Sequence, residues 1–90
     1  MRVRLLVSER FYRRVERLPP HRAEAARRAL AKFIEAPLRP GLNFEKLRNL
    51  SQDYWSIRSG KGDRILLKRI SDDEFEAIDV GTHDIYDRLK

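Results

Sequence analysis

The chain opens with a strand-like pattern that gives way to a helical one. Valine and leucine occupy every second position across residues 3–7, which predicts a short half-buried strand. Ser8 stands where the N-cap of a helix is expected. Phe11, Val15 and Leu18 follow at helical spacing and predict one apolar helix face.

Two prolines divide this helix from a second one. Pro19 cannot continue the first helix, whereas Pro20 is well suited to the first position of the next. The apolar stripe predicted along the second helix consists of Ala23, Ala26, Leu30, Phe33 and Ile34. Pro37 and the turn at Pro40-Gly41 end it. We therefore expect a helical hairpin.

Beyond Leu42 the apolar period changes from helical to two, which is typical of strands. The predicted strands are residues 44–50, 54–58, 64–70 and 75–80. In the second of these, Trp55 and Ile57 are expected on one face. Tyr54, Ser56 and Arg58 are expected on the other. The Gly-rich segment 59–63 predicts a hairpin turn.

These elements predict an α+β domain with the order β-α-α-β-β-β-β. Three strands joined by tight turns form an antiparallel meander, and a helical hairpin must cover one face of it. Ninety residues, of which 41% are hydrophobic, supply one modest core. We expect a single domain over residues 1–90.

The charge of the chain is strongly basic and unevenly distributed. Its formal net charge is +6. Residues 1–50 contain 13 Lys and Arg against 5 Asp and Glu, whereas residues 51–90 contain 7 against 9. A basic surplus favours polyanionic partners, because Lys and Arg displace the counterions of a phosphate backbone. The simpler alternative is a solvated, Arg-rich surface.

Several kinds of site are excluded by what the sequence contains. Without cysteine there is no disulfide or thiolate metal site, and two distant histidines are poor metal ligands. The Gly60-Lys-Gly62 segment lies between two predicted strands, not at a strand-to-helix phosphate loop. We expect no cofactor. The first residues are too short an apolar run for an export signal or a membrane span, so we expect a cytoplasmic protein.

A polar set around the predicted sheet has the composition of a phosphodiester-cleaving centre. It consists of Arg58, Lys61, Arg64, His83 and Tyr86. The two arginines flank one hairpin turn and should lie close together across the strand pair. Guanidinium groups bind phosphate, imidazole moves protons near neutral pH, and tyrosine stacks on a base or assists proton transfer.

Each of these residues also has a simpler interpretation. The two arginines would be ordinary strand charges if they paired with Asp53, Asp63 or Asp79. His83 would be a solvent or packing residue. Tyr86 would cover the sheet edge with its apolar ring.

Four segments, taken in order, resemble the RelE/ParE family of bacterial toxins. They are Leu42-Asn-Phe-Glu-Lys-Leu47, Trp55-Ser-Ile-Arg58, Arg64-Ile-Leu66 and Asp79-Val-Gly-Thr-His-Asp-Ile-Tyr86. The preceding strand and helical hairpin have the same layout, so the resemblance covers nearly the whole chain.

The resemblance implies the toxin of a type II toxin–antitoxin pair. RelE-like members cleave mRNA in the ribosomal A site, without a metal, by attack of a 2′-hydroxyl that leaves a cyclic phosphate. On this resemblance Arg64 binds the transition-state phosphate, and Arg58 is the family's strand arginine. His83 lies where members carry an arginine or histidine, and Tyr86 matches their C-terminal tyrosine.

The sequence departs from the RelE pattern just before Arg58. Some members carry two lysines where this chain has Tyr54 and Ser56, which brings it closer to the HigB-like branch. Other cations are therefore candidates for binding RNA or the ribosome, namely Lys46, Arg48, Lys61, Arg27, Arg28 and Lys32.

Two other functions stay open on the sequence. One is a ParE-like toxin that inhibits DNA gyrase by contact, and the other is a catalytically silent module that binds an antitoxin or nucleic acid. All three functions imply a cognate antitoxin as partner, because an acidic or amphipathic segment would neutralise the basic surface.

Overall fold

The structure is a computed structural model that describes residues 2–89. Its strands are β1 (Arg4–Val7), β2 (Glu45–Lys46), β3 (Tyr54–Ser59), β4 (Asp63–Ser71) and β5 (Glu74–Gly81). Its helices are α1 (Glu9–Arg17) and α2 (Pro20–Glu35). Two 3₁₀ segments complete the chain, η1 (Pro40–Leu42) and η2 (His83–Leu89). This order confirms the predicted α+β arrangement.

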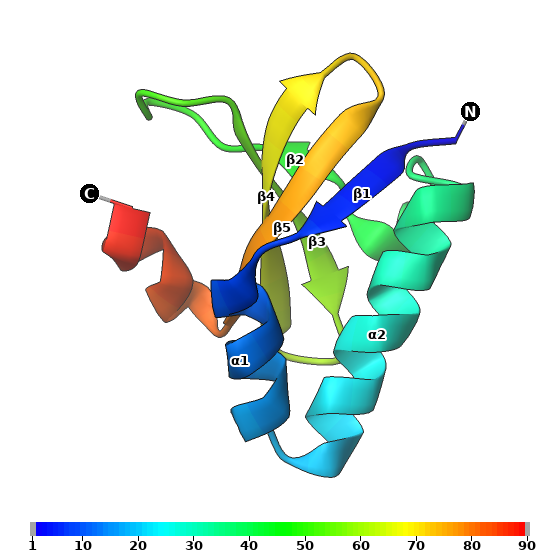
Figure 1. The fold of residues 1–90 in the computed structure, drawn as a ribbon, viewed down its shortest axis with the longest axis vertical. Helices are drawn as coiled ribbons and strands as arrows, with labels where there is room; N and C mark the ends of the chain where they lie inside the picture. Colours follow the sequence, from blue (N-terminus) through cyan, green and yellow to red (C-terminus); the bar gives the residue numbers. More distant parts are fainter. Residues whose placement is uncertain (1, 90) are drawn as a thin grey trace.

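The five strands form one sheet in the order β1-β5-β4-β3-β2. Strands β2 to β5 pair antiparallel as predicted, whereas β1 joins the far edge parallel to β5. The two helices run antiparallel to each other against the sheet, and the C-terminal segment lies on the side away from α2 (Figure 1). None of the described helices is both long and apolar enough to cross a membrane.

The helix boundaries follow the capping and breaking residues of the sequence. The Ser8 hydroxyl accepts a hydrogen bond from the Phe11 N–H at 3.0 Å, which caps α1 as predicted. The two prolines leave a sharp bend between Arg17 and the start of α2 at Pro20. The helical hairpin is confirmed.

The core lies between the helices and the sheet and contains an aromatic cluster. Phe33 of α2 is fully buried and packs edge-on against Phe44 and Phe75, with ring centroids 5.1 and 5.3 Å away. Phe44 also stacks on Trp55 at 4.6 Å. Ile57 is buried with them, so the predicted core face of the 54–58 strand is confirmed.

Three expectations about local structure were wrong in detail. The strand expected at 44–50 is only the two residues of β2, because Asn49 adopts a left-handed conformation with φ of 63° that turns the chain away. Val7 is exposed rather than half-buried, because β1 is an edge strand. On α2 it is Ala29 that is buried, while Ile34 is exposed. Small side chains let the helix approach the sheet closely along its alanine face.

Candidate active site

Two arginines face each other on the β3–β4 hairpin without an acidic partner. Arg58 and Arg64 are direct strand partners, as the sequence predicted. Neither forms an ion pair with an acid among residues 2–89. Like charges opposite each other destabilise a sheet, so this pair costs folding free energy. Such an arrangement suits an anionic ligand placed between them.

The acids that would have neutralised these arginines are bound to other cations. Asp63 accepts two hydrogen bonds from Arg22 of α2, each 2.8 Å long. Asp53 accepts from the Trp55 indole N–H at 2.7 Å and pairs with Lys46 at 3.7 Å. Asp79 binds arginines of α1 and η2. The simpler interpretation of Arg58 and Arg64 as paired strand charges is therefore wrong.

The Asp63 pair is a structural link between α2 and the hairpin. Its hydrogen bonds, together with the charge of the carboxylate, raise the pKa of Arg22 above its ordinary value. This two-point contact fixes the turn that follows Arg58 against the start of α2.

Neutral groups hold the guanidinium of Arg64 in place. One of its terminal nitrogens donates to the Ser56 hydroxyl at 2.7 Å and to the backbone oxygen of Asn43 at 3.0 Å. Its Nε atom is buried and has no hydrogen-bond partner within the described residues 2–89. The side chain is thus oriented without being neutralised, and its positive charge stays available.

Ser56 connects Arg64 to the C-terminal segment. The Tyr86 hydroxyl donates to the Ser56 oxygen at 3.4 Å, and Ser56 itself is fully buried. The ring of His83 lies edge-on to the ring of Tyr86, with centroids 5.7 Å apart. The structure therefore brings together Arg64, Tyr86 and His83. Ser56 is a site residue that sequence reasoning missed, because it was noted only for its face of the strand and as the replacement of a family lysine.

Glu45 is a second residue that the sequence did not reveal. It is the strand partner of Ser56, so its side chain projects from the same face of the sheet. It is exposed and forms no ion pair among residues 2–89. Because β2 is only two residues long, it has no alternation of apolar and polar residues that could have identified Glu45.

The C-terminal segment that carries His83 and Tyr86 is held to the sheet by one buried acid. Asp79 of β5 is 3% exposed and accepts from Arg88 of η2 at 3.0 Å and from Arg14 of α1 at 3.2 Å. Arg10 adds a third, longer contact at 3.6 Å. Fully buried Ile85 anchors the same segment.

The remaining predicted cations are spread over the molecule. Lys46 is the strand partner of Trp55 and so lies on the opposite face from Ser56. Arg48 is exposed in the loop after β2, and Arg27 is exposed on α2. Lys61 lies in the β3–β4 turn and lines a separate pocket of about 550 Å³. None of these four joins the Arg64 cluster.

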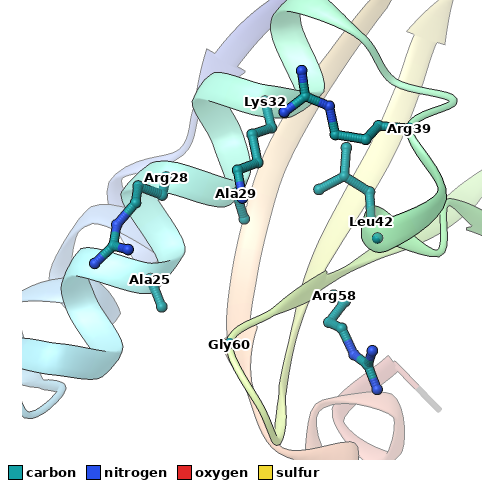
Figure 2. A pocket seen from close by; sticks show the side chains of 9 residues that line it. Ala25, Arg28, Ala29, Lys32, Arg39, Leu42, Arg58 and Gly60 are labelled. Carbon is teal, nitrogen blue, oxygen red and sulfur yellow. The ribbon is translucent and has the colours of Figure 1, made fainter.

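Arg28 and Lys32 line a groove of about 260 Å³ between α2, η1 and the end of β3 (Figure 2). Arg39, which follows α2, directs its side chain back toward the helix. Arg58 lies at the margin, and its side chain points away from α2 toward the C-terminal segment. Across residues 2–89 there is no group of three or more His, Cys, Asp or Glu side chains that could hold a metal ion.

Comparison with known proteins finds similarity in structure alone. Neither protein-family models nor curated protein sequences give a match. An archaeal RelE–RelB complex from Pyrococcus horikoshii matches with a TM-score of 0.70 and 15% identity, covering 91% of this chain and 96% of that one. A RelB–RelE complex from Methanococcus jannaschii gives 0.71 and 20%, covering 94% and 99%.

A bacterial toxin gives a similar result. The free E. coli toxin RelE, in a variant with two arginines replaced by alanine, matches with a TM-score of 0.67 and 21% identity. The match covers 99% of this chain and 95% of that one. Each comparison thus extends over almost the whole of both chains, and we conclude that this protein has the RelE fold.

Proposed function

We propose that this chain is the toxin of a type II toxin–antitoxin pair and that it cleaves mRNA in the ribosomal A site. The observation that carries the proposal is the Arg58–Arg64 pair, which has no acidic partner among residues 2–89 and lies beside Tyr86 and His83. The RelE fold supports it, because the similar structures are toxins. Such a protein would act in the cytoplasm, where translation takes place.

The proposed reaction is attack of a ribose 2′-hydroxyl on the adjacent phosphorus. The O2′–P bond forms and the P–O5′ bond breaks, which leaves a cyclic phosphate and a 5′-hydroxyl. Arg64, already oriented by Ser56 and Asn43, stabilises the charge that develops on the phosphate oxygens. Arg58 provides a second cation on the same face.

We assign the two proton transfers to Glu45, the strand partner of Ser56, and to His83, whose ring lies against that of Tyr86. Glu45 accepts the proton of the 2′-hydroxyl, and His83 supplies a proton to the leaving 5′-oxygen. The Tyr86 hydroxyl, positioned by Ser56, contacts the phosphate or the neighbouring base. Every group in this scheme belongs to the chain itself.

Cleavage-site mapping on a translated message tests the proposal. We expect the wild type to cut the message only on ribosomes and to leave 5′-hydroxyl ends. Because Arg64 acts on transition-state charge, Arg64→Ala should slow cleavage by about 10²–10³-fold. His83→Ala should slow it as well, because the leaving 5′-oxygen loses its proton donor.

An intact message in the presence of the wild type would contradict the proposal. If the protein were toxic to cells all the same, a supercoiling assay with DNA gyrase would then identify a ParE-like activity. If it were not toxic and bound only an antitoxin, it would be a silent relative.

The partner we propose is an antitoxin with an acidic or amphipathic segment. Two of the similar structures are complexes of RelE with RelB. The net charge of +6 and the unpaired arginines of this chain favour an acidic partner.

A further inference from the structure

The groove beside α2 has an unusual lining, because its charges all have the same sign. Four of its nine lining residues are cations, namely Arg28, Lys32, Arg39 and Arg58, and none is acidic. Arg28 contacts Glu24 at 3.6 Å, but both side chains are more than half exposed, so this pair is weak. Lys32 and Arg39 form no ion pair among residues 2–89.

The floor of the groove offers little apolar surface to a partner. Two of its apolar residues are buried in the protein, with Ala29 only 6% and Leu42 only 3% exposed, and the third, Ala25, has a small side chain. An amphipathic protein helix needs large apolar anchors to bind a groove, and the groove offers none. What the groove offers is positive charge, which suits a phosphate backbone better than the apolar face of a helix.

The groove and the candidate active site share Arg58. Arg58 lines its margin while its side chain points to the other face of the sheet, where Arg64 is its strand partner. Gly41 and Gly60 line the groove without side chains that would block it. Arg28 and Lys32 are one helical turn apart, or about 6 Å along the axis of α2. The cations of the groove therefore extend from Arg58, the strand partner of Arg64, to α2 and Arg39.

We propose that this groove binds the sugar–phosphate backbone of the substrate RNA where the strand continues beyond the cleaved bond. This inference rests on the proposed function, which identifies the bound strand as the substrate RNA. Arg39 is the RNA-binding residue that this inference adds, since its side chain extends toward Lys32 at the groove and forms no ion pair among residues 2–89. Arg27, on the same helix, does not line the groove.

The test measures binding of uncleavable single-stranded RNA, fully 2′-O-methylated, at two lengths. A trinucleotide covers only the Arg64 site, whereas a longer strand also reaches the groove. The variant is R28A/K32A/R39A, in which all three side chains are exposed, so the fold should persist in a thermal melt. The control, R4A/R13A/R17A, removes the same charge from β1 and α1.

For the longer strand, the groove variant should show a slope of log affinity against log salt that is shallower by about 2, as expected for three lost phosphate contacts. In the groove variant, the longer strand should therefore lose its affinity advantage over the trinucleotide, and between about 50 and 200 mM salt the wild type should lose about 20-fold more affinity for the longer strand than the variant. Trinucleotide binding should not change, and the control should resemble the wild type at both lengths.

Three results would overturn the inference. The first is a wild type that binds the longer strand no better than the trinucleotide. The second is a groove variant that binds the longer strand as tightly as the wild type does. If that variant also failed to bind the antitoxin, the groove would be a protein-docking surface. The third is a groove variant that loses only ribosome binding, which would point to ribosomal RNA. Because the probe cannot be cleaved, these results are independent of whether the protein is a nuclease.

Discussion

At the scale of single residues, Arg64 shows how the site conflicts with stability. Its guanidinium lies opposite Arg58, its Nε is buried without a partner, and its hydrogen bonds go to neutral oxygens. The repulsion from Arg58 and the unpartnered Nε each lower the free energy of unfolding, and the two hydrogen bonds to neutral oxygens raise it only slightly. Residues that violate local rules in this way are commonly functional.

Arg64→Met should therefore remove activity without removing stability. Methionine keeps most of the volume, eliminates the unpartnered Nε and relieves the repulsion from Arg58, while two hydrogen bonds are lost. We expect a Tm within about 8 °C of the wild type, which corresponds to about 1 kcal/mol, and cleavage slower by about 10²–10³-fold. Differential scanning calorimetry and the ribosome assay measure the two effects.

Arg69→Met on the same strand is the matched control. Arg69 pairs with Asp72 at 3.2 Å and donates to the backbone oxygen of Ser71, away from the site. The Arg69→Met substitution should lower the Tm slightly and leave the cleavage rate unchanged. Retained cleavage in Arg64→Met, or a collapse of its Tm, would contradict the assigned role.

At the scale of elements, the geometry of the site depends on how η2 docks on the sheet. Arg88 is bound to the buried carboxylate of Asp79, and Ile85 packs tightly over Gly81. A Cβ added at Gly81 would lie 2.9 Å from the Ile85 methyl Cγ2, which is closer than real contacts allow. Glycine at this position is thus what lets η2 approach and bring Tyr86 to Ser56.

Gly81→Ala should displace η2 and slow cleavage. A shift of several tenths of an ångström at Tyr86 and His83 is expected to reduce the rate by about 10–100-fold. Hydrogen exchange of the backbone amides in 83–89 should accelerate, because the segment is held less firmly. Gly62→Ala is the control, since an added Cβ there has no neighbour within 4 Å. Equal rates for both variants would show that η2 docking does not set the activity.

At the scale of the whole molecule, the two buried acids of the sheet are paired within the fold, and the surplus cations remain on the surface. Asp63 and Asp79 bind arginines of α1, α2 and η2, so they contribute to the junctions between elements. The cations that give the chain its net charge of +6 therefore lie on the surface, including the Arg58–Arg64 pair and the groove of α2. Surface charge of this sign favours association with polyanionic or acidic partners.

Binding of the product of the adjacent gene should stabilise the chain and suppress its cleavage activity. At a free antitoxin concentration of about 100 times Kd, the gain in unfolding free energy is about 2.7 kcal/mol. For a domain of this size, that gain corresponds to a rise in Tm of at least about 10 °C. Co-purification followed by a thermal melt measures it. An adjacent product that neither binds nor raises the Tm would count against a toxin–antitoxin pair.

Local features of the sequence determined the elements and one part of the site. The Ser8 cap, the two prolines and the Gly-rich turn define the boundaries of α1, α2 and the β3–β4 hairpin through short-range sterics and hydrogen bonds. The pairing of Arg58 with Arg64 follows from the same turn, because the turn sets the register of its two strands. These conclusions needed no knowledge of the remainder of the chain.

Only the tertiary structure decided which distant residues meet. The parallel pairing of β1 with β5, the three arginines around Asp79 and the contact of Tyr86 with Ser56 join segments far apart in the sequence. No periodicity or motif encodes such contacts, since they depend on which faces the elements bury against one another. The sequence by itself determined that two arginines would share a hairpin. The fold decided that neither would form an ion pair among the described residues, because it bound Asp63, Asp53 and Asp79 to other cations instead.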